Sequence, residues 1–188
     1  MKCAIIGGST LPYNINENKL TEIKEFGRWL AQNNIDLLTG GCYGFPYVIG
    51  QECIKAGGNV KAYSPAKSEE EARNIYNHPN DGFNAIEYLK NPSETTNINF
   101  LVRSLPLIND ADIIICLEGN WGTLFEIVTG IIAGKTQIIW QGFGGISDMF
   151  DGLYFKLSNN CKYDYKEKIY FFNDINSIKQ TLIKIKRN

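Results

Sequence analysis

The sequence predicts an α/β protein with a Rossmann-like, doubly wound parallel sheet between two layers of helices. Short apolar runs alternate along the chain with longer segments whose apolar residues recur at helical spacing. This alternation is typical of a parallel sheet that is covered on both faces. The 188 residues contain no repeat, linker or low-complexity tract that would divide them. We therefore expect one three-layer α/β/α domain over residues 1–188.

Continuous apolar runs that end at glycine or proline are typical of buried strands, and they place the strands of the sheet. The predicted strands are 3–6, 35–38, 60–63, 113–117, 137–140 and 170–172, with a short one at 85–89. Glycine-rich turns follow three of them, at Gly7-Gly8, Gly40-Gly41 and Gly119–Gly122. In a parallel sheet these turns gather at one edge, where ligands of doubly wound folds bind.

Apolar residues at spacings of three and four predict the helices between these strands. The predicted ranges are 18–33, 45–56, 95–108, from about Thr123 to 133, and 147–157, before a last helix capped by Asn173 or Asp174. Pro106 is expected to bend or end the third of these helices. Residues 64–84 are polar and without a clear period, which predicts a long loop.

Composition excludes several classes of function. The formal net charge of −1 gives no basic excess for nucleic acid or an anionic membrane surface. The five cysteines are odd in number and form no C-x-x-C pair, and His78 is the only histidine. This pattern argues against a disulfide framework and against a zinc site. We expect a cytoplasmic protein that needs no metal or organic cofactor and has neither a nucleic-acid nor a membrane partner.

The turn over residues 119–123 is the sharpest local motif. It joins the most apolar predicted strand to a helix, where free N–H groups and the positive end of the helix dipole favour an anion. Its glycines let the backbone approach a phosphate closely. By pattern alone, a phosphate site and an ordinary strand-to-helix turn fit equally well.

Other candidate motifs have simpler interpretations. The sequence has no G-x-G-x-x-G, and the segment from Gly130 to Thr136 has only three residues between its glycines, one fewer than a Walker A loop. Gly134 is better explained as a helix terminator. Cys42 lies in a glycine turn and has no evident activating partner. Glu126 and Arg103, taken by pattern alone, could serve helix charge complementation or a structural ion pair.

The turn and its flanking segments resemble the LOG-like family, Rossmann-like nucleoside 5′-monophosphate phosphoribohydrolases formerly labelled possible lysine decarboxylases. The family motif P-G-G-x-G-T-x-x-E is similar to residues 118–126. The family's Arg-Lys pair on the preceding helix is similar to Arg103-Ser104, and its G-G-G-x-x-G-x-M-G is similar to residues 39–47. The first turn, Gly7-Gly8-Ser9, is similar as well. The resemblance covers roughly residues 1–145.

The resemblance implies an activity and a homodimer with sites near the subunit interface. Glu126 would stabilise positive charge on the ribose as the N-glycosidic bond breaks, and Arg103 would hold Glu126, the phosphate or the departing base. The nucleotide and its phosphate would contact Gly8, Ser9, Gly40, Gly41, Gly44, Gly119, Asn120, Trp121, Gly122 and Thr123. The products would be a free base and ribose 5-phosphate.

Three positions depart from the family pattern, where Glu118, Asn120 and Ser104 replace proline, glycine and lysine. A carboxylate near a phosphate opposes its binding, and the missing lysine removes a counter-charge. These departures favour a non-catalytic nucleotide-binding or sensor module as the alternative function. A base-exchanging ribosyl- or deoxyribosyltransferase, with the carboxylate as nucleophile, is a further alternative.

Overall fold

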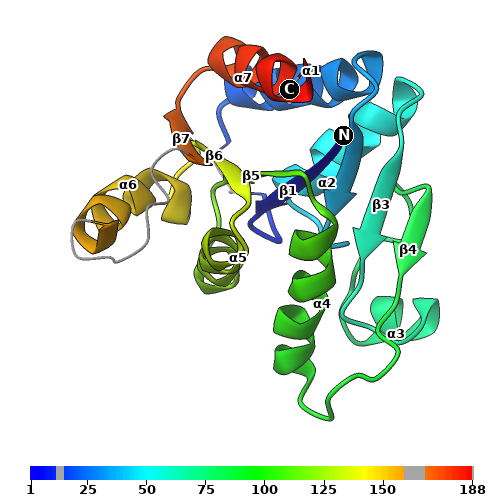
Figure 1. Ribbon diagram of the computed structural model, residues 1–188. Coiled ribbons are helices and arrows are strands. Elements are labelled where there is room, and N and C mark those ends of the chain that lie inside the picture. The colour runs from blue at the N-terminus through cyan, green and yellow to red at the C-terminus, as the bar shows by residue number, and fades with distance from the viewer. Residues whose placement is uncertain (12–14, 159–167, 188) are drawn as a thin grey trace.

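The computed structural model describes residues 1–11, 15–158 and 168–187, and these residues form seven strands and seven helices (Figure 1). The strands are β1 (Lys2–Gly7), β2 (Asp36–Thr39), β3 (Val60–Tyr63), β4 (Ala85–Glu87), β5 (Ile113–Leu117), β6 (Thr136–Trp140) and β7 (Ile169–Phe172). The helices are α1 (Glu17–Gln32), α2 (Phe45–Lys55), α3 (Glu69–Asn74), α4 (Thr96–Asp110), α5 (Trp121–Ile132), α6 (Gly145–Ser158) and α7 (Ile175–Arg187).

All the strands pair in parallel in one sheet, in the order β4-β3-β2-β1-β5-β6-β7. Strands β2, β3 and β4 follow one another on one side of β1, and β5, β6 and β7 follow one another on its other side. The order therefore reverses between β1 and β5, where Gly7 pairs with Leu117. This reversal is the topological switch point, at whose carboxyl edge doubly wound folds bind their ligands.

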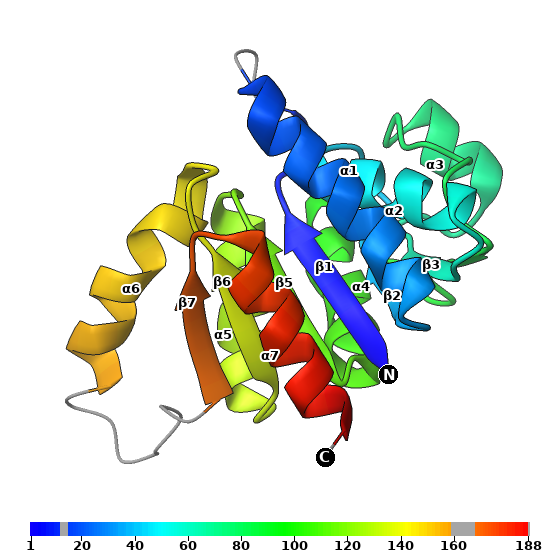
Figure 2. The same cartoon turned by 90° about the horizontal axis from the view of Figure 1, so that it is seen from above.

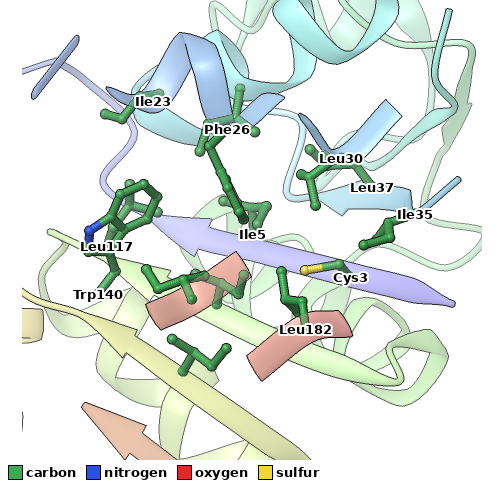
Figure 3. Packing of buried hydrophobic residues seen from close by; sticks show 14 of the residues in the cluster. Cys3, Ile5, Ile23, Phe26, Leu30, Ile35, Leu37, Leu117, Trp140 and Leu182 are labelled. Atoms are coloured by element: carbon green, nitrogen blue, oxygen red, sulfur yellow. The ribbon is translucent and has the colours of Figure 1, made fainter. Parts of the chain in front are cut away.

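Helices cover both faces of the sheet, which confirms the predicted three-layer architecture. On one face, α1, α2 and α7 pack their apolar sides onto the sheet, with Phe26, Leu30 and Leu182 fully buried (Figures 2 and 3). On the other face, α4, α5 and α6 bury a second cluster that includes Leu107 and Ile127. Because the strands are buried on both faces, their sequences are continuous apolar runs.

Three predicted elements needed correction. The segment predicted as a loop contains α3, which Ser68 caps by accepting a hydrogen bond from the Glu71 N–H at 3.2 Å. Pro106 does not end α4, because Leu107 and Ile108 behind it are buried against the sheet and hold the last turn. Helix α5 begins at Trp121, two residues before the predicted start.

The remaining boundaries agree with the prediction to within two residues, and several caps are as expected. Asp174 accepts a hydrogen bond from the Ser177 N–H at 2.8 Å at the start of α7. Gly134, at a φ of 65°, follows the end of α5 as a terminator. Among the described residues, no helix combines the length and hydrophobicity needed to span a membrane.

Candidate functional site

A pocket of about 180 Å³ opens at the switch point, above the carboxyl ends of β1 and β2 and beside the first turn of α5. Its floor includes Ile5 and Ile6 of β1, and its walls include Phe100 and Leu101 of α4. Polar groups from three glycine-rich turns and from two helices converge on it. This location is the one that the sequence predicted for a ligand.

Glycines let the three turns pack closely around this pocket. A Cβ on Gly44, whose φ is 92°, would lie 2.0 Å from the carbonyl oxygen of Gly8. A Cβ on Gly40 would lie 2.4 Å from Nη1 of Arg103. The turn after β2 therefore packs against the turn after β1, and its Gly40 leaves room for the Arg103 guanidinium. Larger residues at these positions would displace the walls of the pocket.

The first turn of α5 offers backbone N–H groups to the pocket. Its N-cap, Asn120, makes no side-chain cap hydrogen bond, and the first turn carries no acidic residue. The first backbone bond joins the Leu124 N–H to the Asn120 carbonyl at 2.9 Å. The amides of residues 121–123 come before this bond and have neither a side-chain cap nor a carboxylate within the first turn. This helix end is therefore suited to an anion. Gly122 and Thr123 line the pocket beside it.

Glu126 and Arg103 form a buried ion pair inside the pocket. Arg103 Nη1 donates to Glu126 Oε1 at 2.6 Å, and the two side chains are only 11% and 5% exposed. The Ser104 hydroxyl donates to the same oxygen at 2.7 Å. Burial lowers the pKa of Arg103, but the Glu126 charge and the Cys42 sulfur raise it, so that the net shift is upward. Two donors therefore fix one carboxylate oxygen, and Glu126 lies in the second turn of α5.

Cys42 lines the same pocket but is not poised as a nucleophile. Its sulfur lies 4.0 Å from Arg103 Nη2 and 3.5 Å from the Gly40 carbonyl oxygen. Burial raises the pKa of the Cys42 thiol, and the nearby arginine only partly opposes this effect. The thiol therefore stays protonated near neutral pH, in agreement with the absence of an activator in the sequence. Cys3, Cys53 and Cys116 are also buried and free, and Cys161 lies outside the described residues.

Glu118 lies between the β1 turn and the α5 turn. Its backbone is left-handed, with a φ of 56°, and its N–H donates to the buried Ser147 hydroxyl at 2.9 Å. Its carboxylate packs against Gly8, so that a Cβ there would lie 1.8 Å from Oε2. Burial raises the pKa of Glu118, although the Gly119 and Gly8 amides partly offset the shift. On the other side, the Ile146 N–H donates to the Gly119 carbonyl at 2.8 Å.

The structure brings most of the predicted site residues together. Those that line the pocket are Gly8, Ser9, Gly40, Arg103, Asn120, Gly122, Thr123 and Glu126. Four others do not line it. Gly41 faces Ala62 and Tyr63, Gly44 supports Gly8, Gly119 packs against Thr123, and the Trp121 residue is 86% exposed. These four positions shape the turns or face solvent in this structure.

Three residues at the site went unnoticed as contributors in the sequence. Ser104 donates to Glu126 in place of the family's lysine, Ser147 holds the Glu118 amide, and Thr39 lines the pocket as a fully buried side chain. Ser104 and Thr39 fall within the family motifs and could have been singled out there. Ser147 comes from a distant helix, so that only the fold reveals its contact with Glu118.

The fold and the site together define a Rossmann-like protein with an uncapped helix end beside a buried carboxylate. The chain belongs to the SLOG cluster4 family, whose model matches residues 1–171. A comparison of the sequence with curated proteins found no match.

Solved structures share this fold at low sequence identity. A structural-genomics target, TM1055, has a TM-score of 0.76 at 21% identity, over 97% of this chain and 98% of that one. The molybdenum cofactor binding protein of Rippkaea orientalis has a TM-score of 0.70 at 18% identity, over 98% and 96% of the two chains. DNA processing protein A of Helicobacter pylori has a TM-score of 0.69 at 20% identity, over 98% and 80%.

These neighbours bear on the predicted partners. The Helicobacter protein is described by its single-stranded DNA binding mode, and the Rippkaea protein by its binding of the molybdenum cofactor. Proteins with this fold therefore include binders of both kinds. The near-neutral charge of this chain does not by itself exclude nucleic acid, and that part of the prediction finds no support in the comparisons.

Proposed function

We propose that this protein is a LOG-like phosphoribohydrolase that cleaves the N-glycosidic bond of a nucleoside 5′-monophosphate to free base and ribose 5-phosphate. The observation that carries the proposal is the buried Glu126 carboxylate, held by Arg103 and Ser104 one turn beyond an uncapped helix end. A phosphate at that helix end would direct the sugar toward Glu126.

The chemistry follows from this arrangement. The phosphate would accept hydrogen bonds from the amides of the first α5 turn and from the Thr123 hydroxyl. As the bond from the base to C1′ lengthens, positive charge develops on the ribose ring. Glu126 would stabilise that charge and orient the water that attacks C1′. The attacking water supplies the hydroxyl on C1′, and its remaining proton goes to the departing base.

Arg103 would hold Glu126 in place and supply its counter-charge. A buried charge without a partner is costly, so that the guanidinium stabilises a carboxylate at this depth. Because Ser104 and Arg103 both bind Oε1, the second oxygen of Glu126 remains free of the hydrogen bonds that fix the first. That oxygen is the one we expect to face the sugar. No metal or organic cofactor enters this scheme.

The proposal is tested by incubating the protein with a panel of nucleoside 5′-monophosphates and separating the products by chromatography. We expect free base and ribose 5-phosphate, with release abolished in Glu126→Gln, which matches the native side chain in shape. An exposed control variant, Glu70→Gln on α3, is expected to retain the full rate. Absence of product from every nucleotide, with an intact fold, would reject the hydrolase.

A non-catalytic nucleotide-binding module is the second candidate, because Glu118, Asn120 and Ser104 depart from the family's motif at the site. The Glu118 carboxylate packs on Gly8 beside the turn proposed for the phosphate, where its charge would oppose the phosphate placement that the hydrolase needs. Such a module would show a measurable dissociation constant for a nucleotide without turnover. A base-exchanging transferase would react only after a second base is added, so that the same chromatographic assay separates the three functions.

We also propose that the protein acts as a homodimer through α4 and α5. These helices expose Leu105, Val128 and Ile132, which are 51%, 40% and 74% exposed, on the layer next to the pocket. A contiguous patch of exposed apolar side chains marks an interaction surface, and we propose that these three form part of one. Light scattering of the native chain should give the dimer mass, and Ile132→Glu should give the monomer mass. A native monomer at micromolar concentration would reject this interface.

A further inference from the structure

The Glu118 carboxylate engages backbone donors at the edge of the pocket. Gly8 lines the pocket, yet a Cβ built on it would overlap Oε2 of Glu118 and lie 3.0 Å from Oε1. Burial raises the pKa of Glu118, and hydrogen bonds from the Gly119 and Gly8 amides partly offset the rise. These two amides, in the turns after β1 and β5, therefore face a carboxylate of the chain itself.

The backbone of Glu118 is held in a conformation that favours glycine. Its φ of 56° lies in the left-handed region, which side chains other than those of Asn and Asp seldom adopt. Its N–H donates to the Ser147 hydroxyl at 2.9 Å, and the Gly119 carbonyl accepts from the Ile146 N–H at 2.8 Å. Helix α6 thus fixes this turn, and a strained residue fixed beside a pocket indicates a functional side chain.

The carboxylate lies beside the helix end proposed for the phosphate. A Cβ on Gly119 would overlap the Thr123 hydroxyl, so that Gly119 packs directly on the first turn of α5. Gly8 and Thr123 line the same pocket. Backbone N–H groups of glycine-rich turns and helix ends bind carboxylates and phosphates alike. A phosphate drawn to this helix end would therefore find the Gly8 and Gly119 amides already engaged.

We propose that Glu118 is an internal competitor of the ligand phosphate, an autoinhibitory carboxylate that occupies the amides of Gly8 and Gly119 until the phosphate displaces it. Such a carboxylate withholds donors from the ligand in addition to repelling its charge. Glu118 Oε2 is buried and makes no hydrogen bond within the described residues, so that displacement toward solvent would restore its hydration. The proposal rests on the proposed function only for the position of the phosphate.

Inorganic sulfate tests the competitor without a base, a sugar or a reaction. Glu118→Gln removes the charge and keeps the side chain against Gly8, whereas Glu118→Gly removes the side chain and suits the left-handed backbone. Titration calorimetry of the full chain should show sulfate binding roughly fivefold tighter in Glu118→Gln, from the lost repulsion. Binding should be about fivefold tighter again in Glu118→Gly, from the donors set free.

The control is Glu70→Gln, which removes an exposed charge on α3 and should bind sulfate as the native chain does. Equal sulfate affinities of Glu118→Gln and Glu118→Gly would leave only repulsion through space and would overturn the proposal. Sulfate binding by Glu118→Gly that is no tighter than that of the native chain would overturn it as well.

The amide resonances of Gly8 and Gly119 report on the same donors in the native chain, without any substitution. Sulfate should shift both resonances in a nitrogen–proton correlation spectrum as it replaces the carboxylate. In Glu118→Gly both should move upfield without ligand, because they lose a charged acceptor, and return on saturation with sulfate. If sulfate shifts the amides of residues 121–123 but neither glycine amide, the anion does not take the place of Glu118, and the proposal fails.

These outcomes are separate from those of the hydrolase assay. Sulfate binding that meets the expectations above, without release of base from any nucleotide, would support the competitor and reject the reaction. Release of base by the native chain, with both glycine amides unresponsive to sulfate, would support the reaction and reject the competitor.

Discussion

Arg103 of α4 and Glu126 of α5 are joined across the pocket by a 2.6 Å hydrogen bond between Nη1 and Oε1, and both side chains are nearly withdrawn from solvent. A buried pair of this kind is costly to break, because removal of one partner leaves the other charge without compensation. The pair thus fixes α4 against α5 and sets the charge inside the site.

We expect Arg103→Met to lower the free energy of unfolding by about 3–5 kcal/mol, because Glu126 would keep its burial and lose its counter-charge. The double variant Arg103→Met with Glu126→Gln should regain part of this loss. Urea unfolding of the native chain, the two single variants and the double variant measures the coupling. If the double variant loses as much stability as the two single variants together, the two side chains do not stabilise each other.

Ser147 is expected to matter for the phosphate turn although it lies on α6. Its hydroxyl accepts from the Glu118 N–H at 2.9 Å and donates to the Gly144 carbonyl at 3.0 Å. Ser147→Ala leaves a partly buried N–H without its partner and should lower stability by about 1–3 kcal/mol. It should also weaken ribose 5-phosphate binding, as measured by calorimetry.

Thr129→Ala is the matched control for Ser147→Ala. It also removes a hydroxyl that bonds to a carbonyl, here that of Phe125 at 2.7 Å, at the far end of α5. We expect it to leave ribose 5-phosphate binding unchanged. If the two variants weaken binding equally, the effect of Ser147 is general destabilisation and not positioning of the turn.

Glu118 is expected to weaken phosphate binding in the native protein. Glu118→Gln keeps the shape of the side chain against Gly8 and removes its charge, so that ribose 5-phosphate should bind roughly fivefold more tightly. The gain should shrink as salt is raised, since screening weakens the repulsion. Glu70→Gln, which removes an exposed charge on α3, controls for the change in net charge. Unchanged or weaker binding by Glu118→Gln would show that this carboxylate does not oppose the phosphate.

The sequence predicted the strands of the sheet and the sheet edge at which the pocket lies, and the reason is physical. Strands buried on both faces have continuous apolar runs, and parallel pairing brings the turns after Gly7, Thr39 and Leu117 to one edge. The helix α3 was missed because it is only six residues long and buries only Ala72, which leaves no apolar period. Its signals were the cap at Ser68 and the three following glutamates.

Side-chain partners were harder to predict than positions. The contact of Arg103 with Glu126 followed from the family motifs, whereas Ser147 meets Glu118 only because α6 packs beside the end of β5. Trp121, which was expected at the nucleotide, is 86% exposed at the first residue of α5 and does not line the pocket. Local sequence therefore fixed the backbone of the site, and the tertiary packing selected which side chains enter it.

His78 predicts how stability depends on pH. Its ring packs against Tyr76 and Phe100, with centroids 5.6 and 5.8 Å away, and burial together with the Arg103 charge lowers its pKa from 6.5 to about 4. The unfolded chain therefore takes up a proton before the folded chain does as the pH falls. The stability due to neutral His78 is complete above pH 6.5 and is lost progressively toward pH 4.

We expect the native chain to lose about 1 kcal/mol more than His78→Phe between pH 7 and pH 5, after allowance for the partial exposure of the ring. Phenylalanine keeps an aromatic ring between Tyr76 and Phe100 and cannot titrate. The difference between the two proteins therefore reports the protonation of His78. Urea unfolding at several pH values measures the difference. Parallel pH profiles for the two proteins would show that His78 titrates with an ordinary pKa in the folded chain, and that its ring is not shielded by α4.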